Sequence, residues 1–498
     1  MKVRLEQLSS ATGVRFGTSG VRGLATQMTD LVCYAYTCGF LQYLRATGEL
    51  AEARTAVAVA GDLRPSTDRI VEAVCQAVED LGYQPVYCGK VPSPALAFYG
   101  LQQCIPSIMV TGSHIPEDRN GIKFNKPTGE VLKADETGIL QQEVRVPEGL
   151  FDARGAFARR GRGSVRPVND AARQSYMVRY LEVFPPDTFR GLRLGVYEHS
   201  AVGRELLTEL FRALGAEVTP LGRSDRFVPV DTEAIRPEDV ALAQQWAGQY
   251  RFDAIVSADG DSDRPLLSDE HGRWVRGDVL GILCAKFLEA DSVSTPITSN
   301  TALERCGWFA EVRRTRIGSP YVIVSMIEAA RGGARRVVGY EANGGFLIQT
   351  DLELNGQRLS ALPTRDAAIV LLSVLSLARR QGQTVSGLVA TLPRRFTASD
   401  RVGNFPPERS QALLARFNTG NQAADRQAVQ ALFGSLCGAV AGMDRTDGLR
   451  LSFANGEIVH LRPSGNAPEL RCYAEADTPE RAQELTRRAL ELVTQVSA

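Results

Sequence analysis

The chain has 498 residues, more than one hydrophobic core normally holds, so several domains are expected. It carries 57 Lys and Arg against 57 Asp and Glu, and this zero formal net charge argues against a nucleic-acid partner and a membrane-surface role, which both favour a basic excess. No apolar run approaches the roughly 18 residues that span a bilayer, and nine cysteines without a C-x-x-C pair indicate reduced thiols in a cytoplasmic protein.

A glycine-rich string, residues 15–23, lies near the start of the chain. Its three glycines allow backbone amides to approach an anion, and Arg22 offers a planar fork to a phosphate. Gly-rich loops are also common turns, so the string alone is a weak signal.

The next segment predicts a strand–helix–strand unit. Residues 55–60 alternate like a strand, residues 66–81 carry an amphipathic helical pattern, and residues 83–88 return as a strand. Asp62 and Arg64 lie in the first connecting loop, where an ordinary surface ion pair is expected.

A serine follows the next predicted strand. The apolar run 105–110 predicts a buried strand, which would display Ser113 at the strand's carboxyl end, where open α/β sheets place ligands. Gly112 can adopt backbone angles that leave Ser113 projecting. The serine is either a turn residue or a nucleophile, and the loop alone does not decide between them.

Two other residues of this loop are catalytic candidates. Lys123 puts a cation near the return strand, where it is either solvated or able to neutralise charge or exchange a proton. His114 adjoins Ser113, but neighbouring side chains on extended backbone diverge, which disfavours a Ser-His dyad.

An acidic loop follows a second set of predicted elements. A basic, glycine-rich stretch, residues 154–166, predicts a linker, and the apolar strand 252–258 ends at Asp259, Asp261 and Asp263. Three like charges so close repel, so an oxygen-seeking cation between them is the natural resolution. Mg²⁺ fits best because it leaves positions for a phosphate oxygen, whereas a structural Ca²⁺ would need an EF-hand pattern that the following residues lack.

The third set of elements ends in a glycine-rich turn. Strands are expected at 297–300, 311–315 and 336–341, with helices beginning at 277 and 319. Glu341 and Asn343 suit sugar hydroxyls, since Glu accepts and Asn both accepts and donates hydrogen bonds. A plain hairpin with Asn343 at its turn is the alternative.

The last segment contains a possible anion cup. A helix at 407–417, three strands with a turn at 455–456, and a closing helix capped by Thr478 are expected. Between the last two strands, two arginines, a hydroxyl, an amide and free backbone N–H groups make an anion-binding set. Its members are Arg462, Ser464, Gly465, Asn466 and Arg471.

Four of these strings, at 113, 259–263, 341–343 and 462–466, resemble the α-D-phosphohexomutase superfamily and stand in the family's order. That superfamily contains phosphomannomutases, phosphoglucomutases and phosphoglucosamine mutases. The chain departs from the family's usual residues at Gly112, Ile115, Ser262, Asn343, Gly345, Asn466 and Ala467.

The resemblance implies three successive mixed α/β domains and a smaller C-terminal α+β domain around a central cleft. We expect these domains at residues 1–165, 166–275, 276–392 and 393–498. It also implies an isomerase that interconverts hexose 6-phosphate and hexose 1-phosphate, of mannose, glucose or both. The expected route uses a phosphoserine and a hexose 1,6-bisphosphate, which is also the expected activator.

The resemblance further implies residue roles. Ser113 would carry the phosphoryl group, with Lys123, Arg22 and His114 as the other catalytic candidates. Mg²⁺ would be held by the three aspartates and the Ser113 phosphate, and Arg264 would fix the acidic loop and lie with the substrate-binding residues. Glu341 and Asn343 would hold the sugar ring, and the cup at 462–471 would hold the distal phosphate.

Other functions stay open at this point. They are a phosphoglucosamine mutase, a hexose 1,6-bisphosphate synthase, a metal-dependent sugar phosphatase, and a noncatalytic sugar-phosphate sensor. A small sugar phosphate is the expected partner, and the protein is expected to be a monomer or a homodimer.

Overall fold

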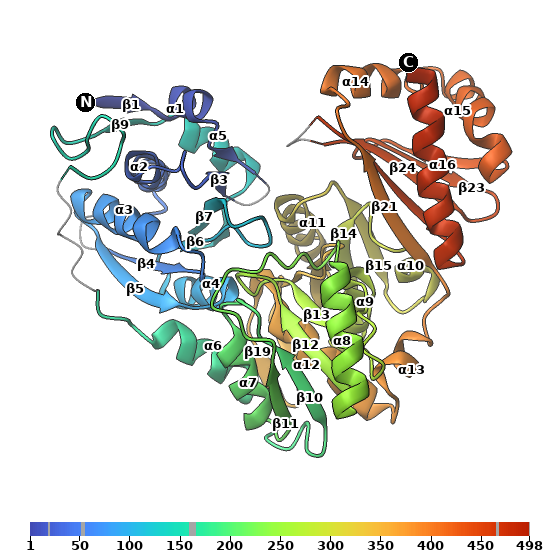
Figure 1. The fold of residues 1–498 in the computed structure, drawn as a ribbon, viewed down its shortest axis with the longest axis horizontal. Coiled ribbons are helices and arrows are strands. Elements are labelled where there is room, and N and C mark those ends of the chain that lie inside the picture. Colours follow the sequence, from blue (N-terminus) through green and yellow to red (C-terminus); the bar gives the residue numbers. More distant parts are fainter. Residues whose placement is uncertain (18–19, 51–54, 159–165, 465–467, 498) are drawn as a thin grey trace. The chain divides into compact units, whose positions relative to one another are not determined.

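The computed structural model describes residues 1–17, 20–50, 55–158, 166–464 and 468–497. Two compact units divide the chain: unit 1 is Met1–Val293 with Gly318–Leu388, and unit 2 is Ser294–Ile317 with Val389–Ala498. The mixed α/β class with several sheets is confirmed (Figure 1). The four-domain division stays a prediction. Among the described residues, no helix is both long and apolar enough to cross a membrane.

The first part of unit 1 is a seven-stranded sheet with the order β2-β3-β7-β6-β4-β5, and β8 pairs with β7. The strands are β2 (Arg15–Phe16), β3 (Val21–Leu24), β4 (Ala56–Gly61), β5 (Gln84–Lys90), β6 (Ser107–Val110), β7 (Arg119–Lys126) and β8 (Gly129–Glu130). The remaining elements of this part are α1 (Leu5–Thr12), α2 (Asp30–Ala46), α3 (Thr67–Asp80), α4 (Ser93–Gln103), α5 (Lys133–Leu140), and the pair β1 (Lys2–Arg4) and β9 (Glu143–Arg145).

The core of this sheet follows from strand alternation. Val57 and Val59 of β4 lie in the hydrophobic cluster that includes residues of α2 and α3, as a period of two requires. The predicted strand–helix–strand unit is therefore confirmed as β4, α3 and β5. Because β4 runs parallel to both β5 and β6, the loops that follow β4 and β6 leave the same edge of the sheet.

The second sheet of unit 1 has the order β11-β10-β12-β13. Its strands are β10 (Arg193–Tyr197), β11 (Glu217–Leu221), β12 (Ala254–Ala258) and β13 (Pro265–Leu267), and its helices are α6 (Ala171–Leu181), α7 (Arg204–Ala213) and α8 (Pro237–Tyr250). β12 and β13 are antiparallel and enclose the acidic loop. The sequence pattern did not predict α8, because its buried face begins with Asp239 and has few large apolar residues.

In the third part of unit 1, β16, β17 and β20 are successive antiparallel neighbours. The elements here are β16 (Val337–Tyr340), β17 (Phe346–Ile348), β18 (Leu352–Leu354), β19 (Gln357–Leu359), β20 (Leu362–Asp366), α9 (Gly277–Phe287), α11 (Ser319–Arg331) and α12 (Ala367–Arg380). The strand expected at 297–300 is wrong: β14 is Ser292–Pro296, and a turn follows it. Hydroxyl residues fill β14, so no apolar run marked it.

Unit 2 holds a five-stranded antiparallel sheet with the order β21-β25-β24-β23-β22. Its elements are β15 (Glu311–Thr315), β21 (Phe396–Val402), β22 (Val440–Asp444), β23 (Leu449–Phe453), β24 (Ile458–Pro463), β25 (Leu470–Ala476), α10 (Ala302–Arg305), α14 (Pro407–Ala415), α15 (Gln422–Cys437) and α16 (Pro479–Ser497), and α13 (Val385–Val389) ends at the boundary between the units. Thr478 Oγ1 accepts from Arg481 N at 3.2 Å, which confirms the predicted cap of α16.

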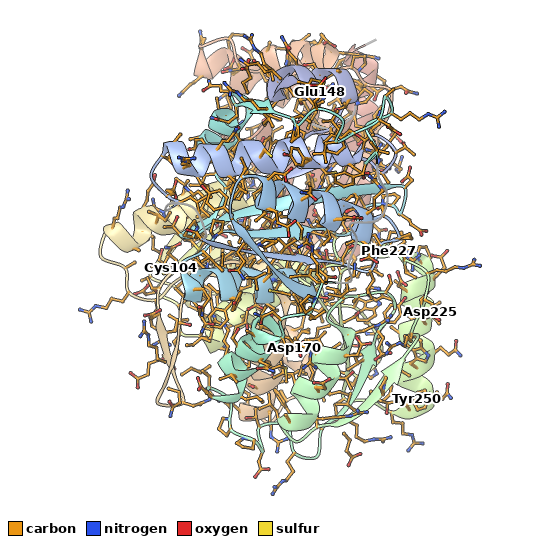
Figure 2. All side chains as sticks on the ribbon, turned by 90° about the vertical axis from the view of Figure 1, so that its left-hand side faces the viewer. Cys104, Glu148, Asp170, Asp225, Phe227 and Tyr250 are labelled. Carbon is orange, nitrogen blue, oxygen red and sulfur yellow. The ribbon has the colours of Figure 1, made fainter. Side chains whose placement is uncertain are left out.

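All nine cysteines are described and are free thiols, as expected from their spacing. Eight are buried or half-buried, and burial raises the pKa of several, including Cys33 to about 12. Cys104 is exposed and ends α4 (Figure 2).

Candidate functional site

The parallel pairing of β4 and β6 determines where Ser113 lies. Gly61 pairs with Val110 at the ends of these strands, so the loop after β4 lies beside the loop that carries Ser113. Ser113 is buried and has a left-handed backbone, with φ of 54°. Its N–H donates to Thr111 Oγ1 at 2.8 Å, which fixes the turn just before the side chain.

The expected surface ion pair of Asp62 and Arg64 is wrong, because both side chains are completely buried. Arg64 instead holds the serine loop: its guanidinium donates to four backbone carbonyls of that loop. The acceptors are the carbonyl oxygens of Ser113, Ile115, Pro116 and Arg119, at 2.6 to 3.0 Å. Asp62 accepts from Thr67 Oγ1 at 2.6 Å and Thr111 Oγ1 at 2.7 Å, partners that a short charged loop does not reveal in the sequence.

Gly112 is needed for space rather than for its backbone freedom, which corrects the expectation from the sequence. Its φ is not positive, and the left-handed residue is Ser113 itself. A Cβ at position 112 would lie 2.6 Å from Arg64 Cζ, closer than any side chain tolerates. Arg64 also stacks on Phe227, which is labelled in Figure 2, with 3.9 Å from Cζ to the ring centroid, so this contact helps to hold Arg64 in place.

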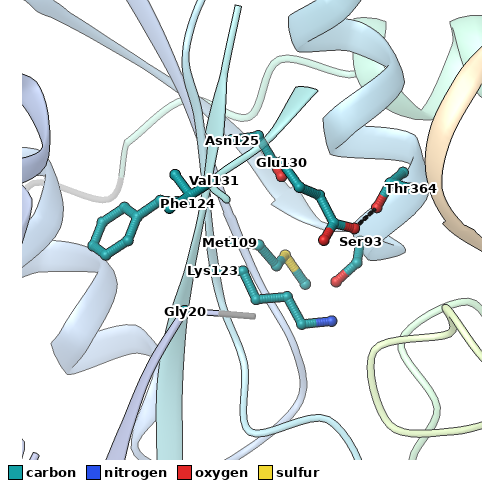
Figure 3. A pocket seen from close by; sticks show the side chains of 9 residues that line it. All are labelled: Gly20, Ser93, Met109, Lys123, Phe124, Asn125, Glu130, Val131 and Thr364. Carbon is teal, nitrogen blue, oxygen red and sulfur yellow. Dashed lines mark hydrogen bonds between the residues drawn. The ribbon is translucent and has the colours of Figure 1, made fainter. Parts of the chain in front are cut away.

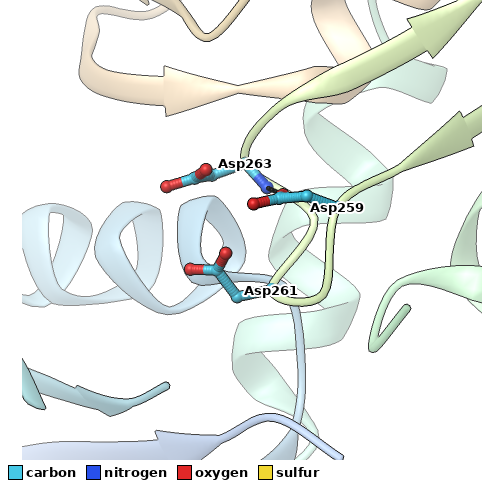
Figure 4. Close-up of side chains that lie close together, drawn as sticks. All are labelled: Asp259, Asp261 and Asp263. Atoms are coloured by element: carbon cyan, nitrogen blue, oxygen red, sulfur yellow. Dashed lines mark hydrogen bonds between the residues drawn. The ribbon is translucent and has the colours of Figure 1, made fainter. Parts of the chain in front are cut away.

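The acidic loop reaches the serine. The carboxylates of Asp259, Asp261 and Asp263 are buried and converge, with one ligand oxygen of each within 4.8 Å of the others (Figure 4). Ser113 Oγ donates to Asp259 Oδ2 at 2.6 Å. Gly260 permits this approach, since a Cβ there would lie 2.7 Å from the Ser113 carbonyl oxygen. Two loops separated by nearly 150 residues therefore form one site.

Cations balance this cluster. Lys123 Nζ donates to Asp261 Oδ2 at 2.5 Å and to Asp263 Oδ2 at 2.6 Å. Arg264 Nε lies 3.9 Å from Asp259 Oδ2. Burial, followed by the charges of neighbouring arginines, lowers the pKa of Arg22 to about 10, so Arg22 stays charged at neutral pH. The structure thus brings Ser113, Lys123, Arg22 and Arg264 together with the aspartates.

The residues present fit a divalent cation. Burial, and then the charges of Asp261 and Asp263, raise the pKa of Asp259 well above its usual value. Burial works in the same direction on Asp263, but Arg365 and Lys123 hold its pKa well below the usual range. Among the described residues, Asp261 Oδ1 and Asp263 Oδ1 are buried without a hydrogen-bond partner. Buried carboxylate oxygens with spare lone pairs are the ligands that Mg²⁺ takes.

His114 contacts Ser113, contrary to the expectation that the two side chains diverge. His114 Nδ1 lies 3.3 Å from Ser113 Oγ. The expectation assumed extended backbone, whereas the left-handed φ of Ser113 turns the two side chains to the same side. Burial, followed by the charges of Arg264 and Arg22, lowers the pKa of His114 far below its usual value, so its imidazole is neutral.

The hairpin alternative for the Glu341 and Asn343 turn is confirmed, and sugar binding by these residues stays a prediction. The turn joins the antiparallel β16 and β17, and Asn343 Oδ1 accepts from Gly345 N at 3.0 Å, which is the hairpin alternative. Both side chains are nevertheless buried. Glu341 Oε2 accepts from Arg365 Nη1 at 3.0 Å, and the Asn343 carbonyl accepts from Thr232 Oγ1 at 2.7 Å.

Two residues of the site were missed by sequence reasoning. Ser93, at the start of α4, donates from Oγ to Asp261 Oδ2 at 2.5 Å. Arg365, at the end of β20, donates from Nε to Asp263 Oδ2 at 3.0 Å. Neither stands in a motif, and each meets its partner across more than 100 residues of sequence, so no local signal marks them.

Unit 2 places part of the predicted cup in one location. Arg462 and Arg471 are directly opposite each other on β24 and β25. Arg462 Nε donates to Asp447 Oδ1 at 3.0 Å. Ser464 is buried, and its N–H donates to the Glu469 carbonyl at 2.9 Å. Gly465 and Asn466 lie outside the described residues.

The chain is similar to phosphohexomutases over nearly its whole length. Residues 13–147, 276–396 and 414–492 match alpha/beta/alpha domain I, alpha/beta/alpha domain III and the C-terminal domain of the phosphoglucomutase/phosphomannomutase family. A phosphomannomutase of Sinorhizobium fredii is 45% identical over 96% of this chain and 98% of its own length. A phosphomannomutase of Salmonella muenchen is 42% identical over 95% of this chain and 94% of its own length.

A solved structure gives the same fold. A phosphoglucomutase/phosphomannomutase family protein of Burkholderia thailandensis has a TM-score of 0.72 at 20% identity, covering 96% of this chain and 97% of its own. The chain therefore belongs to the phosphoglucomutase/phosphomannomutase family of the α-D-phosphohexomutase superfamily, and it is a phosphohexomutase, an isomerase that transfers phosphate intramolecularly.

Proposed function

We propose that this phosphohexomutase interconverts mannose 6-phosphate and mannose 1-phosphate, with glucose phosphates as its second sugar, through a phosphorylated Ser113. The observation that carries the proposal is the 2.6 Å contact between Ser113 Oγ and Asp259 inside the buried aspartate cluster. The choice of mannose is supported by two relatives above 40% identity, both phosphomannomutases.

The charge balance explains how the loop carries a phosphate. A phosphoserine adds a charge of about −1.5 to −2 beside the three aspartates. Lys123, Arg22 and Arg264 are the cations that offset it, and because they lie in a buried site their charges act strongly. Asp259, Asp261 and Asp263 would hold Mg²⁺, which when bound supplies Lewis-acid stabilisation of phosphate oxygens.

The transfer itself exchanges one P–O bond for another. The bond from phosphorus to Ser113 Oγ breaks as a bond forms to the C1 hydroxyl oxygen of the hexose 6-phosphate, and the hydroxyl proton passes to a base. His114, whose neutral imidazole contacts Ser113 Oγ, is the candidate for that base, and Lys123 acts as one of the cations. The resulting 1,6-bisphosphate turns over and returns its other phosphoryl group to Ser113, which releases the 1-phosphate. The same bisphosphate would activate an enzyme that has lost its phosphate.

The remaining residues bind the sugar phosphate. Glu341 and Asn343 would accept and donate hydrogen bonds to ring hydroxyls. Arg462, Ser464 and Arg471 would hold the distal phosphate, joined by Gly465 and Asn466 from the same string. A phosphate needs several donors at once, and the opposed arginines of β24 and β25 offer planar forks for it.

The decisive variant is Ser113→Ala. It removes the oxygen that carries the phosphoryl group in the proposed scheme, so turnover in an assay coupled to hexose 6-phosphate formation should fall by about 10³-fold or more. Ser93→Ala is the matched control, because it also deletes one serine-to-aspartate hydrogen bond of the same cluster. We expect it to lose about tenfold at most. Similar activities for the two variants would remove the phosphoserine from the scheme.

The preferred substrate and the product formed distinguish the proposed mutase from the alternative enzymes. Mannose, glucose and glucosamine 1-phosphates should be compared with Mg²⁺ and a trace of bisphosphate, and mannose 1-phosphate should give the highest kcat/KM. A sugar phosphatase would release inorganic phosphate, and a bisphosphate synthase would accumulate bisphosphate. A monomeric or homodimeric state and a cytoplasmic location stay proposals from the sequence.

A further inference from the structure

Arg365 is a charged residue that the proposed chemistry leaves without a role. It is among the largest fully buried side chains of the protein. It stands where β20 ends and α12 begins, next to Asp366, whose side chain caps α12. Burying a guanidinium is expensive unless ion pairs and hydrogen bonds compensate, so its partners indicate what it does.

Two of these partners belong to two different functional loops. Arg365 Nε donates to Asp263 Oδ2 at 3.0 Å, and Arg365 Nη1 donates to Glu341 Oε2 at 3.0 Å. All three side chains are at most 6% exposed. One rigid guanidinium therefore joins a carboxylate of the acidic cluster to the carboxylate of the sugar loop.

A third carboxylate lies around the same guanidinium. Glu130 of β8 accepts from Thr364 Oγ1 at 2.5 Å (Figure 3). It also accepts from Ser319 Oγ at 2.9 Å. Ser319 Oγ in turn accepts from Arg365 Nη1 at 3.4 Å. The three carboxylates come from β8, from the loop between β12 and β13, and from the turn between β16 and β17, so Arg365 stands where the three described parts of unit 1 meet.

Gly345, in the turn that carries Glu341, leaves room for the side chain of Arg365. A Cβ at Gly345 would lie 2.5 Å from Arg365 Cδ and 2.7 Å from its Cγ. The φ of Gly345 is not positive, so its backbone does not require glycine. Glycine at this position therefore serves to admit the stem of Arg365.

We propose that Arg365 is a positioning residue that sets the cation site and the sugar-binding carboxylate together. By binding Oδ2 of Asp263 it leaves Oδ1, which has no hydrogen-bond partner among the described residues, for the cation. By binding one oxygen of Glu341 it leaves the other for a sugar hydroxyl, and this half rests on the proposed function. Lysine cannot replace it, because an ammonium group lacks the planar fork that reaches both carboxylates.

The first test measures the cation without any sugar. Mg²⁺ should be titrated against the midpoint of thermal unfolding for wild type and Arg365→Lys, which keeps the charge. Loss of a residue that orients metal ligands typically costs about 10- to 100-fold in affinity, so we expect at least a roughly tenfold rise in half-saturating Mg²⁺. An unchanged half-saturation would overturn the link to Asp263.

Arg395→Lys is the matched control. Arg395 is also a buried arginine between two carboxylates, with Nε donating to Glu475 at 2.5 Å and Nη1 to Asp477 at 2.6 Å. It should lower stability as Arg365→Lys does, yet leave half-saturating Mg²⁺ within about twofold of wild type. An equal shift in both variants would mean that the effect is general destabilisation and would overturn the proposal.

The second test concerns the sugar loop and separates KM from kcat. Arg365→Lys and Glu341→Gln should each raise KM by about tenfold, and the double variant should be little worse than the worse single variant, because the residues act as one unit. If KM of the double variant rises by the product of the two single effects, the link between Arg365 and Glu341 is overturned. If wild type shows no mutase activity, the proposed function fails, while the Mg²⁺ titration still tests Arg365.

Gly345→Ala gives the same answer without changing a charge. Its added methyl should displace the Arg365 stem, so both the half-saturating Mg²⁺ and KM should rise in the direction seen for Arg365→Lys. If Arg365→Lys does not fold, Gly345→Ala takes its place as the test of the positioning role. Wild-type values for both quantities in folded Gly345→Ala would contradict the proposal.

Discussion

The charged side chains of the candidate site in unit 1 and those of the predicted cup in unit 2 differ in burial. In unit 1, Lys123, Asp261 and Asp263 are at most 10% exposed and each is tied to charged partners distant in sequence. In unit 2, Arg462 and Arg471 are 22% and 39% exposed and pair with Asp447 and Glu469. Buried charges must be fully compensated and are therefore fixed in place, whereas half-exposed pairs contribute little to stability and can exchange their partner for an anion. Under the proposed function, the buried site suits preorganised phosphoryl transfer, and the half-exposed arginines suit reversible capture of a phosphate.

The comparison is tested most strongly by Arg64→Met in unit 1. The change leaves Asp62 buried without its cation and removes the donors to four carbonyls of the serine loop. Removing one partner of a buried pair typically costs about 3–5 kcal/mol, so we expect a loss of this size in the free energy of unfolding, together with most of the activity. Urea unfolding followed by far-UV circular dichroism measures it.

The double variant Asp62→Asn with Arg64→Met is the control for this experiment. It removes the uncompensated carboxylate, so it should recover part of the lost stability although it lacks both charges. It should not recover activity, because the carbonyls of the serine loop remain without Arg64. If Arg64→Met lowers the free energy of unfolding by less than about 1 kcal/mol, this buried ion pair contributes no more than the half-exposed pairs of the cup in unit 2.

Arg462→Ala in unit 2 should act on binding rather than on stability. Hydrogen bonds to a charged group contribute about 1.5–3 kcal/mol, so KM for the hexose phosphate should rise roughly 10- to 100-fold. The pair with Asp447 is partly exposed, so the free energy of unfolding should change by less than about 1 kcal/mol. Steady-state kinetics and urea unfolding of one preparation check both statements. An unchanged KM would count against the phosphate cup.

The sequence predicted the parts of the site that are local strings. Ser113 and the aspartates were found because each follows a short apolar strand, and Lys123 because it returns from the serine loop. The elements around them were also predictable where the period was clear, as in α3 and α16, whose Leu485 and Val493 are fully buried.

The sequence could not show which distant residues pair with the buried charges of the site. Arg365 and Ser93 reach the aspartates from more than 100 residues away and carry no pattern of their own. Asp62 and Arg64 were taken for a surface pair because a short charged loop resembles a solvated one, and only the fold brings Thr111 onto Asp62. The contact between His114 and Ser113 depends on a single left-handed residue, which no periodicity predicts.

The smallest expected effect concerns a buried group of unit 2 that stays neutral, in contrast to the buried charges of the site in unit 1. His460 of β24 is 1% exposed, its Nε2 donates to the Asp447 carbonyl at 2.5 Å, and its ring centroid lies 5.6 Å from that of Tyr473. Burial lowers the pKa of His460 to about 4, and the nearby Arg450 and Arg462 act in the same direction against Asp447.

The sign of the pH dependence follows from this lowered pKa. Between pH 6.5 and 4 the unfolded chain, with an ordinary pKa of about 6.5, binds a proton that the folded state refuses, so the free energy of unfolding falls on acidification. The loss due to His460 should be about 1 kcal/mol between pH 6.5 and 5.5 and at most about 1.4 kcal/mol per pH unit below that. Glutamine keeps an N–H donor but does not titrate, so the difference between the urea-unfolding curves of wild type and His460→Gln isolates this contribution from the carboxylates, which titrate in both proteins. A difference that stays constant from pH 6.5 to 4.5 would mean that His460 takes up its proton as readily in the folded state as in the unfolded chain, so that unit 2 accepts a charge at this buried position.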